Sequence, residues 1–112
     1  MKRIGSAFVL VSIAAVCLWA TNTGDAKKGK VVYTRACQKC HGPDGSGVEA
    51  IAKALKVTLV PLSSEEAQKK TDEEITKIIN EGGGKMKRVP GLSPEDVKDV
   101  IAFVRSLASK EK

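Results

Sequence analysis

Two cysteines and one histidine stand together in Cys37-Gln38-Lys39-Cys40-His41. Two thiols three positions apart on one helical turn can reach the two vinyl groups of one porphyrin. The adjacent histidine is then presented to the iron on one face. Cys-x-x-Cys-His is the sequence at which c-type haem is attached. We therefore predict one covalently attached haem c, bonded to Cys37 and Cys40, with His41 as an axial iron ligand.

Other uses of these three side chains fit the sequence less well. A structural zinc site needs four ligands, usually cysteine or histidine. The chain has one histidine, and its third cysteine, Cys17, lies in an apolar N-terminal run. A thioredoxin-like redox pair needs a βαβ context, and no such pattern surrounds the cysteines. A plain disulfide between Cys37 and Cys40 stays open, but it would leave a core this small without the support that a cofactor gives.

A second axial ligand must come from elsewhere in the chain. With a single histidine, ligation by two histidines of one chain is excluded. Met86, in the glycine-rich segment 82–91, is the only methionine besides Met1. We predict that it ligates the iron, although a methionine can also be a simple gap-filler. A thioether ligand raises the reduction potential, and a filled sixth position favours electron transfer over catalysis.

Three other functions stay open at this point. Met86 could detach and let a small ligand bind the iron, as in a sensor. A peroxidase is disfavoured by the single haem and the lack of a distal histidine. The chain could also be a subunit docked permanently on a larger complex.

The N-terminus has the pattern of an export signal. Lys2 and Arg3 precede an apolar run from residue 4 to residue 20, as in a secretory signal peptide. We predict residues 1–20 as the signal, with cleavage after Ala20 or up to Ala26, and residues 21–112 as a single domain. This places the protein in the periplasm or another exported compartment, a thylakoid-type lumen included. An uncleaved anchor and lipidation at Cys17 are minor alternatives, and we expect no stable membrane insertion.

The charge pattern limits the class of partner. The net charge is +6 and aromatic residues make up 4% of the chain, so neither a strong basic footprint nor a base-stacking surface for nucleic acid is present. Four cations lie near the predicted haem residues in the sequence: Lys39, Lys85, Lys87 and Arg88. They could steer an acidic redox protein toward the haem, and solvated surface charge explains them equally well. We expect redox protein partners and no nucleic acid.

The remaining pattern is helical. Asp25 is an N-cap for a helix over 26–36, and short helices are expected over 48–55 and 64–69. Thr71 and Glu74 predict a capping box for a helix ending near Gly82. Ser93 followed by a proline begins the last helix. The fold class is therefore all-α, with long loops of the kind that wrap a ligand.

Several of these segments resemble the class I c-type cytochromes, especially the short single-haem bacterial and algal members. Gly29 and Tyr33 look like the family's glycine-x-x-x-aromatic signature, and Phe103 lies in the matching last helix. Residues 40–47, CHGPDGSG, are similar to the family's haem loop. The resemblance implies a cytochrome c-like fold whose first and last helices cross closely, and a one-electron carrier rather than an enzyme, working between partners outside the cytoplasm.

The resemblance also implies a residue that orients the ligand histidine. In the family, a proline carbonyl usually accepts the other ring N–H of the ligand histidine. Pro61 is the candidate here and Pro43 the alternative. Two features depart from the family pattern: Lys87 stands where many members have proline after the methionine, and Trp19, the only tryptophan, belongs to the signal. A group other than tryptophan must therefore hold the haem propionates.

Overall fold

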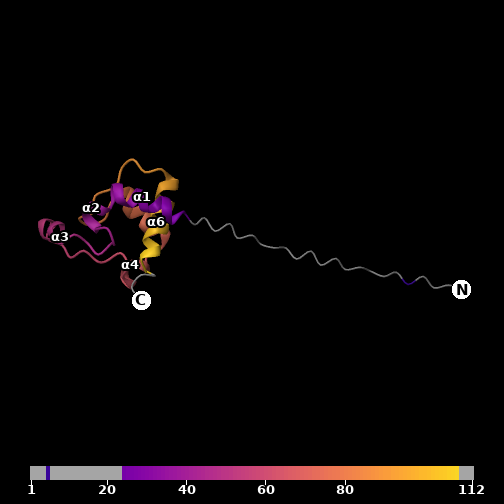
Figure 1. The fold of residues 1–112 in the computed structure, drawn as a ribbon, viewed down its shortest axis with the longest axis horizontal. Coiled ribbons are helices and arrows are strands. Elements are labelled where there is room, and N and C mark those ends of the chain that lie inside the picture. Colours follow the sequence, from indigo (N-terminus) through magenta and orange to yellow (C-terminus); the bar gives the residue numbers. More distant parts are fainter. Residues whose placement is uncertain (1–4, 6–23, 109–112) are drawn as a thin grey trace.

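The computed structural model describes Gly5 and residues 24–108, and this part of the chain is helical (Figure 1). Its helices are α1 (Ala26–Ala36), α2 (Gln38–His41), α3 (Glu49–Leu55), α4 (Glu65–Gln68), α5 (Asp72–Glu81) and α6 (Pro94–Leu107). The predicted all-α class is confirmed, since the only β feature of the described residues is an isolated bridge between Gly83 and Met86. Apart from Gly5, the predicted signal segment 1–20 lies outside the described residues.

Side-chain caps fix where the long helices begin. The Asp25 carboxylate accepts from the backbone N–H of Lys27 at 2.9 Å. Ser93 and Asp96 form a complete capping box at the start of α6, with bonds of 3.0 and 3.1 Å. At α5, the Thr71 hydroxyl accepts from the Glu74 N–H at 3.1 Å, which is one half of the capping box that the sequence predicts.

The first and last helices cross at close range. Asp99 of α6 lies directly against Gly29 of α1, where a β-carbon would be 1.8 Å from the Asp99 carbonyl oxygen. The Asp99 side chain, 6% exposed, accepts from the N–H of Asp25 at 2.8 Å. Beside this contact the Tyr33 and Phe103 rings pack with centroids 4.8 Å apart. The close crossing implied by the resemblance is therefore present.

The core lies between these helices and α5. Its buried apolar members are Val32, Tyr33, Ile79, Val97, Val100, Ile101, Phe103 and Leu107. Most of them come from α6, which contacts both α1 and α5. In the described part of the chain, no helix has both the length and the apolar character needed to cross a membrane.

Arg105 of α6 forms hydrogen bonds to the segment that connects α4 and α5. Its guanidinium donates to the carbonyl oxygens of Gln68 at 2.8 Å and Lys70 at 2.5 Å, and to the Asp72 carboxylate at 2.8 Å. The Gln68 side-chain amide in turn donates to the carbonyl of Val104 in α6 at 3.0 Å. These bonds hold the connection between α4 and α5 against the last helix.

Candidate haem-binding site

The Cys-x-x-Cys-His segment forms one tight turn at the end of α1. The Cys37 N–H donates to the Tyr33 carbonyl at 2.8 Å and ends α1. The Cys37 carbonyl then accepts from the N–H of Cys40 at 3.2 Å and of His41 at 3.0 Å, which makes α2 a single helical turn. Both cysteines are free thiols and half-buried. The turn thus presents both thiols and the imidazole from one short piece of backbone.

The glycine-rich loop after His41 folds back over this turn. The Tyr33 hydroxyl donates to the Gly42 carbonyl at 2.5 Å, a bond buried in the core. The His41 carbonyl accepts from the Gly47 N–H at 2.7 Å. Further along, the Gly45 carbonyl accepts from the Leu62 N–H at 2.9 Å and so brings the extended segment after α3 toward the histidine.

The loop that carries Met86 is shaped by its backbone. Gly83 and Met86 exchange two hydrogen bonds, of 3.0 and 2.9 Å, across a turn in which Gly84 has a φ of 56°. Gly82 follows α5 with a φ of 82°, and a β-carbon there would lie 2.8 Å from the Met86 carbonyl oxygen. The Val89 N–H donates to the Ile79 carbonyl at 2.8 Å and holds the loop on α5.

Two adjoining hollows bring the motif and the methionine together. The outer hollow is about 500 Å³ and the inner one about 260 Å³. Cys37, His41, Leu59 and Met86 line both of them, and Cys40 lines the outer one. A larger hollow of about 710 Å³ between α5 and α6 contains none of these residues. The four predicted haem residues therefore share one cavity, although Met86 is distant from the others in sequence.

The inner hollow has mostly apolar walls. The side chains on α5 and α6 that line it are Ile75, Ile78, Ile79, Val100 and Val104. Leu59 and Leu62 close it from the extended segment after α3. No role was assigned to this segment from the sequence, although its apolar residues around Leu59 were a usable signal.

Burial affects the protonation states of the candidate haem-binding side chains. Desolvation lowers the pKa of His41, so its imidazole is neutral at pH 7, which is the form that binds metals. Desolvation first, and then the nearby Cys40, raises the pKa of Cys37 to about 11. The Nδ1 atom of His41 is buried and has no hydrogen-bond partner among the described residues.

Neither proline forms the bond that the resemblance implies. The Pro61 carbonyl accepts from the N–H and hydroxyl of Ser64, at 3.0 and 2.6 Å. Pro43 is exposed in the loop after His41. Since Nδ1 of His41 is without a partner, the role of Pro61, with Pro43 as its alternative, stays a prediction.

The donor set and the cavity fit a haem. A neutral imidazole and a thioether line one cavity, two thiols stand at its edge, and its walls are apolar enough for a flat macrocycle. Such a cavity lies within the range of about 300–1,000 Å³ usual for cofactor sites.

A family model described as "Cytochrome C oxidase, cbb3-type, subunit III" matches residues 24–104. The chain belongs to this family of small c-type cytochromes. A solved structure titled "KustC0563 c-type cytochrome" is similar to it, with 32% identity and a TM-score of 0.56 over 75% of this chain and 98% of that one. No curated protein matches.

Membership of this family indicates the general role of the protein. c-Type cytochromes bind haem c and carry electrons, and the family favours electron transfer over catalysis. The matched range, 24–104, includes Cys37, Cys40, His41 and Met86.

Proposed function

We propose that this cytochrome holds one haem c and passes one electron at a time between redox proteins outside the cytoplasm. Cys37 and Cys40 bond the haem through thioethers, and His41 and Met86 are its axial ligands. The observation that carries the proposal is that Met86 lines the same cavity as Cys37, Cys40 and His41.

The chain's own residues would set how the iron behaves. Haem iron supplies the one-electron chemistry by alternating between its ferrous and ferric states. His41 is kept neutral by burial and so offers a free lone pair. A methionine as the second ligand raises the reduction potential. If His41 and Met86 both hold the iron, they would leave no place for oxygen or peroxide to bind, which supports a carrier rather than an oxidase or peroxidase.

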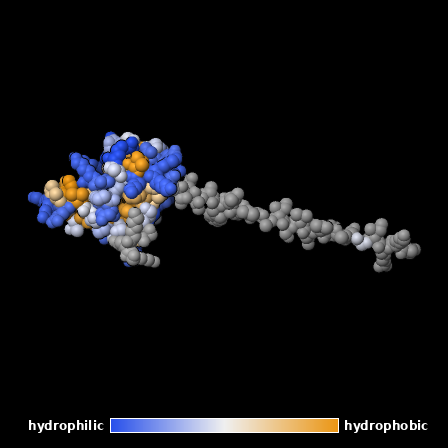
Figure 2. Space-filling model, viewed as in Figure 1, coloured by the Kyte–Doolittle hydropathy of each residue, from blue (hydrophilic) through white to orange (hydrophobic). Residues whose placement is uncertain are grey.

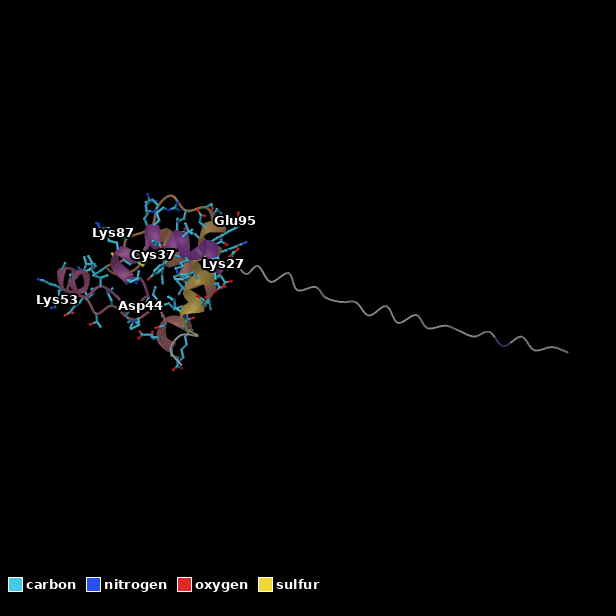
Figure 3. All side chains as sticks on the ribbon, viewed as in Figure 1. Lys27, Cys37, Asp44, Lys53, Lys87 and Glu95 are labelled. Carbon is cyan, nitrogen blue, oxygen red and sulfur yellow. The ribbon has the colours of Figure 1, made fainter. Side chains whose placement is uncertain are left out.

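Positive charge around the outer hollow supports an acidic redox partner. Lys39, Lys85, Lys87 and Arg88 are all exposed and all line this hollow. Lys87 projects outward beyond Cys37 (Figure 3). In the view of Figure 2, the surface of the described residues is mostly hydrophilic, with small apolar patches over α1 and α3. Such a surface suits a brief, salt-sensitive encounter with a small interface.

The proposal that the protein works outside the cytoplasm rests on the pattern of its N-terminal residues. The charged start and apolar run of residues 1–20 support export by a signal peptide. Haem attachment to cysteines takes place outside the cytoplasm, which agrees with an exported protein. We place the cytochrome in the periplasm or an equivalent exported compartment.

Absorption spectra of the protein and two variants test the proposal. The full chain is expressed with haem-maturation machinery, beside Met86→Ala and Leu55→Ala. Leu55 also lines the outer hollow but has no ligand atom, so its variant controls for a shortened wall. We expect a covalent low-spin haem with the weak long-wavelength sulfur-to-iron band in the parent and in Leu55→Ala, and loss of the band in Met86→Ala. A high-spin parent that binds carbon monoxide readily would contradict ligation by Met86 and favour a sensor.

A further inference from the structure

We propose that Lys70 binds a propionate of the haem, an inference that rests on the proposed function. Haem carries two propionate carboxylates on the edge opposite its vinyl groups. A carboxylate taken out of water without a partner is costly. The one tyrosine already donates its hydroxyl to the Gly42 carbonyl, so the partner must be another group.

The position of Lys70 in the cavity matches that edge. The thioether edge of the haem is fixed where α1 meets α2, at Cys37 and Cys40. The inner hollow extends from Cys37 to Glu66, Ala67 and Lys70, at and just after α4. α2 and α4 lie well apart (Figure 1). Lys70 is the only lysine or arginine that lines the inner hollow in the part of the chain described.

The backbone of Lys70 is held in place while its ammonium group is left free. Arg105 donates to the Lys70 carbonyl at 2.5 Å, and the same guanidinium is paired with Asp72 at 2.8 Å. The neighbouring Lys69 is paired with Glu65 at 3.2 Å. Lys70 takes part in no ion pair among residues 24–108. Because this backbone is already ordered, binding at Lys70 need not order the main chain as well.

The other cations of the cavity lie on the thioether side. Lys39, Lys85, Lys87 and Arg88 line the outer hollow, whose wall includes both Cys37 and Cys40. Glu66 lines the inner hollow as Lys70 does, and both residues are exposed. Its negative charge opposes a propionate, so Glu66 and Lys70 should act on the propionate pKa in opposite directions.

The reduction potential of the holoprotein, measured as a function of pH, tests the proposal. The variants are Lys70→Gln and, as a control with the same loss of charge at the next residue, Lys69→Gln. Lys70→Arg keeps the charge. An opposite charge within about 4–6 Å lowers a carboxyl pKa by about 1–3 units. We therefore expect Lys70→Gln to move the propionate inflection up by about one pH unit. Lys69→Gln and Lys70→Arg should leave it near the parent value, and Glu66→Gln should move it down.

Two results would overturn the assignment. Equal shifts in Lys70→Gln and Lys69→Gln would mean that only net charge matters. An inflection moved by Arg88→Gln and unmoved by Lys70→Gln would place the propionates beside the methionine loop. In both cases a retained covalent haem and sulfur-to-iron band would leave the proposed function standing, whereas a parent without haem would end both proposals.

Discussion

The α-carbon of Gly29 lies against the Asp99 carbonyl so closely that a β-carbon on it would be 1.8 Å from that oxygen. The nearest atoms that a β-carbon would meet belong to the Asp99 backbone, so no side-chain rotation can relieve the clash. The helices would have to separate, and Cys37 at the end of α1 would move with them. The position of the Cys-x-x-Cys-His turn thus depends on position 29 having no β-carbon.

We expect Gly29→Ala to lower the free energy of unfolding of the holoprotein by about 3 kcal/mol, the upper part of the usual range for overpacking. Urea unfolding followed by circular dichroism measures it. Lys30→Ala, at the next and exposed position, should change stability by no more than about 0.5 kcal/mol. A Gly29→Ala protein as stable as this control would show that the two helices can slide apart at little cost.

Tyr33→Phe removes the hydroxyl that donates to the Gly42 carbonyl. The Gly42 carbonyl then keeps only its longer bond from the Gly45 N–H, at 3.3 Å, and we expect the free energy of unfolding to fall by about 1 kcal/mol. The same urea unfolding experiment at pH 7 measures the loss. No loss would mean that another donor replaces the hydroxyl.

The free energies of unfolding of the parent and of Tyr33→Phe should depend differently on pH. Desolvation raises the pKa of Tyr33 to about 12 in the folded protein, while the unfolded chain ionises near 10. Between these values the unfolded state loses its proton first, so the stability from this residue falls as pH rises from about 10 to 12. The advantage of the parent over Tyr33→Phe should shrink in that window, and lysine titration cancels because both proteins share it. A constant difference would contradict the raised pKa.

Loss of the haem should largely unfold the chain. The cavity at the centre is lined by apolar side chains, and without a ligand that surface would face water. Ligand that binds only the folded state stabilises it by linkage, as metals do in small domains. We expect Cys37→Ala/Cys40→Ala, which cannot attach haem, to show a weak helical signal by circular dichroism at 25 °C. A cooperative melt at the temperature of the holoprotein would contradict this.

Neutralising the cations of the outer hollow should slow reaction with an acidic redox protein. Lys85→Gln/Lys87→Gln/Arg88→Gln removes three charges that line it. We expect a rate at least about tenfold lower at low salt, and a weaker dependence on ionic strength. Lys27→Gln/Lys28→Gln/Lys30→Gln removes three exposed charges from α1 instead, and is the matched control. Stopped-flow kinetics measures both, and equal rates in the two variants would mean that steering depends on net charge alone.

The local sequence predicted the helices. It did not predict the contacts between residues that are distant in the sequence. The caps at Asp25, Thr71 and Ser93 locate helix starts because capping depends on a few adjacent residues. The all-α class and the c-type cytochrome family were likewise predicted and are confirmed. The bonds from Arg105 to the α4–α5 connection and from Asp25 to Asp99 have no local pattern, since each joins residues that only folding brings together.

The candidate site divides in the same way. The haem motif is predicted by residue spacing. Met86 was predicted by elimination, because His41 is the only histidine and the other methionine, Met1, falls in the predicted signal. That they line one cavity is a property of the fold. The lining role of Leu59 was missed because the other residues that line the same hollow come from distant segments of the chain.

The turn from Gly83 to Met86 is made by main-chain hydrogen bonds alone. Its shape therefore does not depend on which side chain position 86 carries. A histidine or lysine there would be delivered to the same cavity with little change to the rest of the fold. Evolution, or an engineer, could then exchange the axial group and retune the driving force of the carrier without redesigning the scaffold.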